Sequence, residues 1–177
     1  IFMKKPAKCC PIEKQKGVLI ICRHPLGDTV TESPFLRGIR GGYPEHHITV
    51  VCSNENYNLL ERCPYIDELL VYNSQTEKSF LKENLKKTYQ FAKGHLWKRS
   101  YDLAVIPSTS MPAIIEAWIV YFSGARQRIT YSERFNPIMH REYMGGYDRY
   151  FTDVIFDKEI KHEVERNLEL LSYINGE

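Results

Sequence analysis

The stretch that decides the fold is GVLIICRHPLGDTVTESP, which spans residues 17–34. It opens with Val18–Cys22, a short unbroken run of apolar residues that is typical of a strand buried on both faces of a parallel sheet. The loop RHPLGD follows with a single glycine, and a helical pattern then runs from about Thr29 to Arg40. Strand, loop and helix in this order predict the first unit of an α/β fold.

The same alternation continues along the chain. Further strands are predicted at residues 48–52, 68–72, 102–106 and 128–131, with a short sixth at 154–156, and helices at 54–62, 79–97, 110–122 and 161–174. Such alternation implies parallel strands joined by right-handed crossovers, with helices on both faces of the sheet. The predicted fold class is therefore α/β, a Rossmann-like doubly wound parallel sheet of five to six strands in the order 3-2-1-4-5.

The first predicted helix contains two signals for its ends. Ser33-Pro34 predicts a cap and a first helical position, and the proline would bend any helix that begins before it. Gly41-Gly42 predicts the end of this helix.

Length and composition are those of one globular domain. The chain has 177 residues, 43% hydrophobic and 26% charged, and a net charge of +2, which argues against a protein that coats nucleic acid. Residues 1–16 are predicted to be an extension and residues 17–177 a domain. The longest apolar run, 113–122, is too short to span a bilayer. Five cysteines, an odd number, do not suggest a disulfide framework, so a cytoplasmic compartment is expected.

Common cofactor motifs are missing from the sequence. The loop after the first strand lacks the G-x-G-x-x-G pattern of dinucleotide binding, and no P-loop pattern occurs in the chain. Cys9, Cys10 and His24 have a spacing that matches no standard zinc site. No cofactor and no metal are therefore predicted.

Ligands of doubly wound sheets bind outside the carboxyl ends of the strands, which here points to residues 23–28 and 107–110. Asp28 has two interpretations, an N-cap of the following helix or a general base that takes the proton of an attacking hydroxyl. Gly27 suits either, because tight turns favour glycine. His24 is a candidate acid, base or hydrogen-bonding partner of a phosphate, or else a solvated loop residue. Arg23 is a candidate anion binder, or else a solvent-facing strand end.

Two further groups of residues are candidate binding residues. The hydroxyls that follow the fourth strand could bind a sugar or a phosphate beside a helix N-terminus. Basic residues gather in the helix after the third strand and again among aromatic residues at 126–149, and together they could flank a cleft for an anionic ligand. The alternative is a solvated face. The substrate-binding candidates in these groups are Ser108, Thr109, Ser110, Lys82, Lys86, Arg134 and Arg141.

Five segments, in order, resemble the N-terminal domain of family 9 glycosyltransferases, the lipopolysaccharide heptosyltransferase family. They are VLIICRHPLGDTVTESPFLRGIR (18–40), YPEHHITVVCSNENYNLLERCPYIDELLVYN (43–73), YDLAVIPSTS (101–110), GARQRITY (124–131) and HEVERNLELL (162–171). The loop of the first segment departs from the family at His24-Pro25-Leu26, where small or polar residues are usual, which leaves the acceptor open.

The resemblance implies one half of a two-domain GT-B enzyme. This half would hold an anionic glycan or glycolipid acceptor, while a C-terminal domain absent from this chain would bind a nucleotide-sugar donor similar to ADP-heptose. Asp28 matches the family's base, and transfer would invert the anomeric centre without a metal. A peripheral contact with the inner membrane and no nucleic-acid partner are expected. The alternative is a non-catalytic Rossmann-like binding module.

Overall fold

The computed structural model describes residues 16–73, 81–107, 114–132, 146–156 and 161–176. Six parallel strands form one sheet in the order β3-β2-β1-β4-β5-β6, so the predicted fold class and strand order are confirmed. The strands are β1 (Lys16–Cys22), β2 (His47–Cys52), β3 (Glu68–Val71), β4 (Ser100–Ile106), β5 (Gln127–Tyr131) and β6 (Asp153–Ile155).

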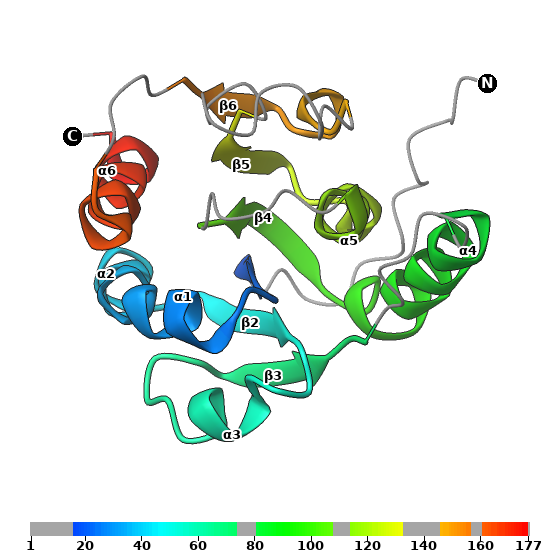
Figure 1. The fold of residues 1–177 in the computed structure, drawn as a ribbon, viewed down its shortest axis with the longest axis horizontal. Coiled ribbons are helices and arrows are strands. Elements are labelled where there is room, and N and C mark those ends of the chain that lie inside the picture. The colour runs from blue at the N-terminus through cyan, green and yellow to red at the C-terminus, as the bar shows by residue number, and fades with distance from the viewer. Residues whose placement is uncertain (1–15, 74–80, 108–113, 133–145, 157–160, 177) are drawn as a thin grey trace.

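Helices cover both faces of this sheet, as Figure 1 shows. One face carries α1 (Leu26–Thr31), α2 (Ser33–Gly42) and α6 (Glu163–Asn175), while α4 (Leu81–Phe91) and α5 (Ile114–Ser123) lie on the other. The short helix α3 (Tyr57–Leu60) lies beside β3, a π-helical turn continues α4 at Ala92–Leu96, and a 3-10 turn precedes β6 at Asp148–Tyr150.

The core divides into two layers because side chains of a strand alternate between the faces of the sheet. In β1, Leu19 and Ile21 pack on the side of α4 and α5, and Val18, Ile20 and Cys22 pack on the side of α2 and α6. All five side chains are fully buried. The apolar run that predicted the central strand therefore contributes side chains to both layers of the core.

The predicted helix at 29–40 is wrong in detail, because the structure has two helices that meet at Glu32. Pro34 has no N–H to donate to the Val30 carbonyl, which is what interrupts the helix, and the Ser33 hydroxyl donates to that carbonyl at 2.8 Å instead. Ser33 is not the cap: the N-cap position of α2 is Glu32, whose side chain makes no capping hydrogen bond. The helix predicted at 54–62 is shorter, and that at 110–122 is described from Ile114.

Gly38 and Gly41, both in α2, give a matched test of the contact between α2 and α6. A Cβ at Gly38 would overlap Leu171 Cδ2, with Cδ1 and Cγ of the same side chain at 3.2 Å, whereas a Cβ at Gly41 would meet nothing within 4 Å. We expect Gly38→Ala to lower the free energy of unfolding by about 1–3 kcal/mol. Gly41→Ala should leave it unchanged or raise it by up to about 1 kcal/mol. Urea denaturation measures both, and equal effects would contradict this packing.

Candidate functional site

The loop 23–28 lies where the strand order reverses. From β1 the chain proceeds outward through β2 and β3 and then returns to β4 on the other side of β1. The carboxyl ends of β1 and β4 therefore form the switch point at which open α/β sheets bind ligands. Four of the predicted site residues, Arg23, His24, Gly27 and Asp28, belong to the loop or to the first turn of α1.

Asp28 is the third residue of α1, and its carboxylate is partly exposed. The N-cap position belongs to Pro25, so the interpretation of Asp28 as an N-cap is wrong. No hydrogen bond or ion pair joins the Asp28 carboxylate to another residue that the structure describes. Its neighbours on α1, Leu26 and Val30, are 50% and 54% exposed. The helix therefore presents an unengaged carboxylate between two exposed apolar side chains.

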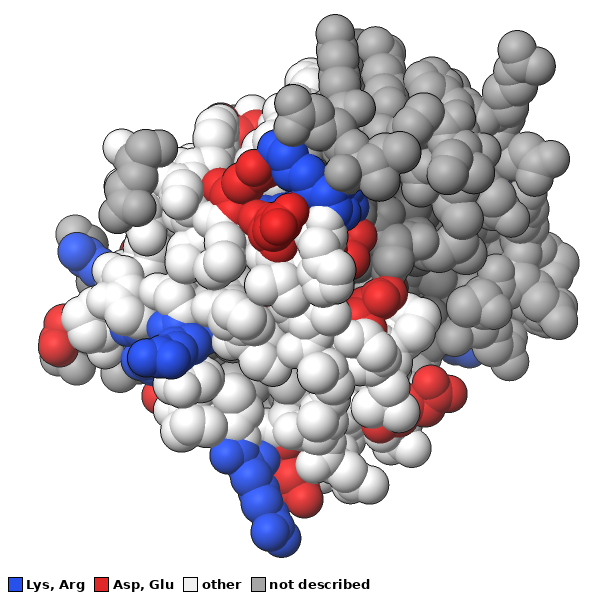
Figure 2. All heavy atoms as spheres, turned by 60° about the vertical axis from the view of Figure 1, so that its left-hand side comes forward, with Lys and Arg blue, Asp and Glu red and all other residues white. Residues whose placement is uncertain are grey.

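The face that carries α1 is largely uncharged. Figure 2 shows it mostly white, with Lys, Arg, Asp and Glu in a few separate groups. Exposed apolar side chains on this side come from α1, α3 and α6, namely Leu26, Val30, Tyr57, Leu59, Leu168 and Tyr173. A molecule that approaches Asp28 from this side meets apolar side chains as well as the carboxylate.

Arg23 is buried and its charge is already engaged. One guanidinium nitrogen donates to Glu116 Oε1 at 2.5 Å, and Nε donates to the Tyr72 carbonyl at 2.9 Å. The guanidinium also lies over the Tyr72 ring, 5.2 Å from its centroid. Arg23 is therefore not a solvent-facing strand end. It joins the end of β1 to the end of β3 and to α5, a bracing role that the sequence alone did not predict.

Glu116 is the partner that the sequence left unassigned. It lies in the first turn of α5 among buried apolar residues, and burial raises its pKa to about 7 while the Arg23 guanidinium opposes that rise. A single acidic residue inside an apolar helix was the available signal, because a buried charge requires a partner.

His24 is buried, contrary to its interpretation as a solvated loop residue. Its Nε2 lies 3.8 Å from Glu32 Oε1, and burial lowers the His24 pKa to about 4. The imidazole is therefore neutral at pH 7. An uncharged, enclosed ring is poorly suited to bind a phosphate directly.

The side chain of Asn56 forms hydrogen bonds with the backbone of this loop. Sequence reasoning did not identify this residue. It is fully buried, and its Nδ2 donates to the carbonyls of Cys22 and His24, at 3.2 and 2.7 Å, and lies 2.9 Å from Thr29 Oγ1. Asn56 lies between Asn54 and Asn58 in a segment that was predicted to be helical, and nothing in that pattern distinguishes it as the buried one. The amide fixes the backbone from the end of β1 to the start of α1.

The remaining candidates have different positions. A Cβ at Gly27 would meet nothing within 4 Å, so the turn there is open to solvent. Lys82 and Lys86 are exposed in the first turns of α4. The other five candidates lie outside the described residues: Ser108, Thr109, Ser110, Arg134 and Arg141.

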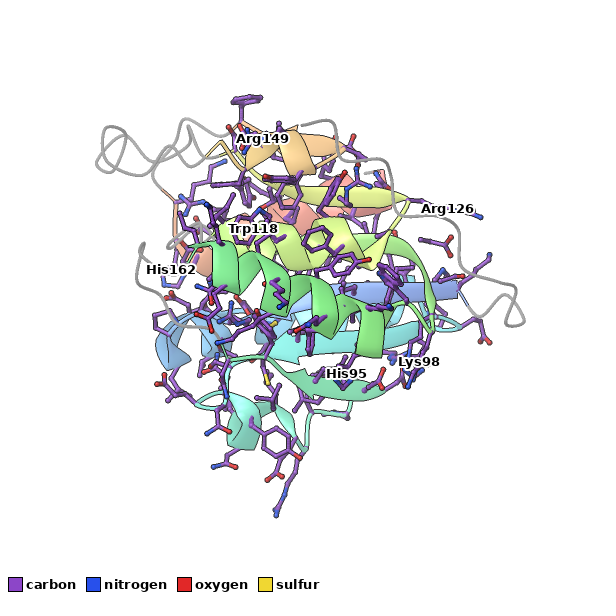
Figure 3. The ribbon with its side chains drawn as sticks, turned by 90° about the vertical axis from the view of Figure 1, so that its right-hand side faces the viewer. His95, Lys98, Trp118, Arg126, Arg149 and His162 are labelled. Carbon is purple, nitrogen blue, oxygen red and sulfur yellow. The ribbon has the colours of Figure 1, made fainter. Side chains whose placement is uncertain are left out.

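The two basic clusters do not all face one edge of the sheet. In Figure 3, Lys98 and Arg126 lie at the opposite end of the sheet from His162, the N-cap residue of α6. Lys98 and Arg126 precede β4 and β5, which places them at the amino ends of the strands, away from Asp28. They belong to the basic groups that could flank one cleft or form a solvated face, and these two exposed residues fit the solvated face.

Neither a metal site nor a membrane span is present in the part of the chain that the structure describes. Within the described ranges, no three His, Cys, Asp or Glu side chains come together in a way that could hold a metal ion. The same ranges contain no helix long and apolar enough to cross a membrane.

Comparisons with known proteins point to one group of structures. The sequence matches no protein-family model and no curated protein. A family 9 glycosyl transferase from Veillonella parvula is similar with a TM-score of 0.70 and 19% identity, over 90% of this chain and 41% of that one. The ADP-heptose LPS heptosyltransferase II of E. coli has a TM-score of 0.60 and 23% identity, over 88% of this chain and 40% of that one. The E. coli heptosyltransferase WaaC with ADP has a TM-score of 0.66 and 15% identity, over 89% of this chain and 47% of that one.

These similarities establish the fold. The chain spans less than half the length of each of these structures. The resemblance seen in the five sequence segments is therefore confirmed for the architecture: this chain has the fold of the corresponding part of family 9 glycosyltransferases.

Proposed function

We propose that this chain is the acceptor-binding half of a glycosyltransferase. It would act on an anionic glycan or glycolipid and take the sugar from a nucleotide-sugar donor similar to ADP-heptose, bound by a second domain. The observation that carries the proposal is the unengaged Asp28 carboxylate at the switch point, in a fold shared with three glycosyltransferase structures. One of those structures is an ADP-heptose LPS heptosyltransferase, and another is a heptosyltransferase with ADP.

The proposed step uses Asp28 as a general base. Its carboxylate takes the proton of an acceptor hydroxyl while that oxygen bonds to the anomeric carbon of the donor sugar. The bond from this carbon to the donor phosphate oxygen breaks, and the nucleotide leaves with the electron pair. Because the oxygen attacks opposite the leaving group, a single displacement inverts the anomeric centre.

The surroundings of Asp28 support an amphipathic acceptor. Leu26 and Val30 offer apolar contact on either side of the base, and the exposed amines of Lys82 and Lys86 lie in the first turns of α4, which follows β3 and so begins at the same edge of the sheet. Ammonium groups near that edge favour an acceptor with acid or phosphate groups. Arg23 and His24 serve this site by holding the loop, and Gly27 leaves room above it.

A direct transfer assay tests the proposal. The longest protein that the reading frame encodes is incubated with ADP-heptose or other nucleotide sugars and with deacylated lipopolysaccharide core. We expect a product heavier by one sugar in mass spectrometry, with the opposite anomeric configuration from the donor in NMR. Binding of core oligosaccharide without any transfer from the donor panel would favour the binding module instead.

A further inference from the structure

A buried pair of titratable side chains beneath α1 has no role in the proposed transfer step. His24 follows β1 and Glu32 stands between α1 and α2, with Nε2 and Oε1 3.8 Å apart. The side chain of His24 is 5% exposed and that of Glu32 is fully buried. Neither His24 Nε2 nor either Glu32 carboxyl oxygen has a hydrogen-bond partner among the described residues. Buried polar atoms are rarely left unpaired, so the pair needs an explanation.

A single proton between the two side chains satisfies both of them. In the neutral tautomer that carries its proton on Nδ1, His24 Nε2 is an acceptor. An ionised Glu32 carboxylate would also only accept, whereas a protonated carboxyl carries one O–H donor. A neutral Glu32 therefore pairs with His24 once the two atoms close by about 1 Å.

The surroundings of Glu32 favour the protonated carboxyl. Burial is the main cause that raises the Glu32 pKa to about 8, and the carboxylates of Asp28 and Glu163 add to the rise. The thiol of Cys22 lies beside the carboxyl and acts in the opposite direction, but a thiol is a weak donor. From β1, α1 and α6, the groups that act on Glu32 are the neutral Cys22 thiol, the Asp28 carboxylate and the Glu163 carboxylate, which pairs with the Arg166 guanidinium at 2.7 Å.

The surroundings of His24 favour a neutral ring. Burial lowers its pKa to about 4, Arg23 acts in the same direction, and Asp28 and the backbone of Ile21 oppose the change. At pH 7 a neutral carboxyl therefore faces a neutral imidazole.

Glu32 is linked directly to the candidate base. Its backbone N–H donates to the Asp28 carbonyl at 3.1 Å, and the Thr31 hydroxyl donates to the same carbonyl at 2.7 Å. At the other end of the segment, the His24 carbonyl accepts from the buried Asn56 amide. A bond between Glu32 and His24 would tie together the two ends of the segment 24–32 that carries Asp28.

We propose that Glu32 is a positioning residue that fixes the segment 24–32, and with it Asp28, by donating its carboxyl proton to His24 Nε2. This inference rests on the proposed function only in naming Asp28 as the base. When Glu32 loses its proton, the donor disappears and a buried carboxylate remains beside Asp28 and Glu163. The segment then loosens.

The sign of the pH dependence follows from the two pKa values. Folded Glu32 keeps its proton up to about pH 8, whereas the unfolded chain releases it near 4.5, so its contribution to stability falls as pH rises between these values. His24 behaves in the opposite sense, because it charges near pH 6.5 when unfolded and near 4 when folded. Its contribution is lost as pH falls from 6.5 to 4.

NMR of the 177-residue chain tests the proposal without any transfer assay. We expect the Glu32 carboxyl carbon to titrate near pH 8, and the amide protection factors of residues 24–32 to fall at least about tenfold between pH 6 and pH 9. In Glu32→Gln the amide N–H donates at every pH, so protection should persist at pH 9. In Glu32→Leu, which has no donor, protection should be low at both values. Glu45→Gln, at an exposed position, is the control and should behave like the wild type.

Three results would overturn the proposal. They are titration of Glu32 near its ordinary value of 4.5, unchanged protection of the segment in the wild type at pH 9, or equal behaviour of the Gln and Leu variants. If Glu32→Leu does not fold, the wild-type titration and Glu32→Gln still decide. Because no substrate is present, the positioning role can fail while transfer activity stands, or stand while transfer fails.

Discussion

Asp28→Ala is expected to lower the turnover of the proposed transferase by roughly 10²–10⁴-fold, the usual contribution of a general base. The carboxylate accepts the proton only as the acceptor oxygen attacks, so its removal should reduce kcat and leave KM nearly unchanged. Asp28→Asn keeps the shape but cannot act as a base, and it should lose a comparable factor. Steady-state kinetics of the longest encoded protein, with the nucleotide sugar and core acceptor, measure both variants.

The fold should survive the loss of Asp28. The side chain is partly exposed, and its interaction with the helix dipole is worth about 0.3–1 kcal/mol, so the free energy of unfolding should change little. Glu45→Ala is a matched control, since it removes an exposed carboxylate from the turn before β2, at the opposite edge of the sheet. Turnover by Asp28→Ala within threefold of the wild type would remove Asp28 as the base.

Glu116→Ala should cause the largest loss of stability, about 3–5 kcal/mol, because it removes the buried carboxylate that pairs with the Arg23 guanidinium. The double variant Arg23→Met/Glu116→Leu should lose less than Glu116→Ala alone, because it removes the buried cation together with the buried carboxylate. Urea denaturation at pH 7 measures all three proteins.

The loss from Glu116→Ala should also depend on pH. Folded Glu116 has a pKa of about 7, above its ordinary value of 4.5, so its contribution to wild-type stability falls as pH rises between these values. The variant has no such dependence. The difference between wild type and variant should therefore be smaller at pH 8 than at pH 5. A larger difference at pH 8 would show that Arg23 outweighs burial and lowers the Glu116 pKa.

The sequence predicted the architecture well because it is set by local patterns. The buried run Val18–Cys22 and its counterparts can be recognised from residue type alone, and alternation with helices fixes parallel strands. Ser33-Pro34 predicted either the start of a helix or a bend in one, and the choice could not be made from the sequence, because the hydrogen bond from Ser33 to the Val30 carbonyl depends on the observed geometry.

The candidate site was predicted only in part, because its contacts are distant in sequence. The position of Asp28 follows from the loop after β1, but Arg23 meets Glu116 across 93 residues and Asn56 reaches His24 across 32. Neither contact leaves a periodic signal. The burial of His24 likewise depends on packing by α1 and its neighbours, which residue types in one loop do not specify.

The parallel sheet has a consequence for the synthesis of this protein. β1 leaves the ribosome before every other strand, yet Lys16 pairs with Ser100, 84 residues further along the chain. Until β4 emerges, one edge of the most apolar strand has no partner, and unpaired apolar strands are prone to aggregate or to bind chaperones. We therefore expect co-expressed chaperones to raise the yield of soluble protein more than slower translation or a lower temperature does. At any rate of synthesis, β1 has to wait for β4 to emerge.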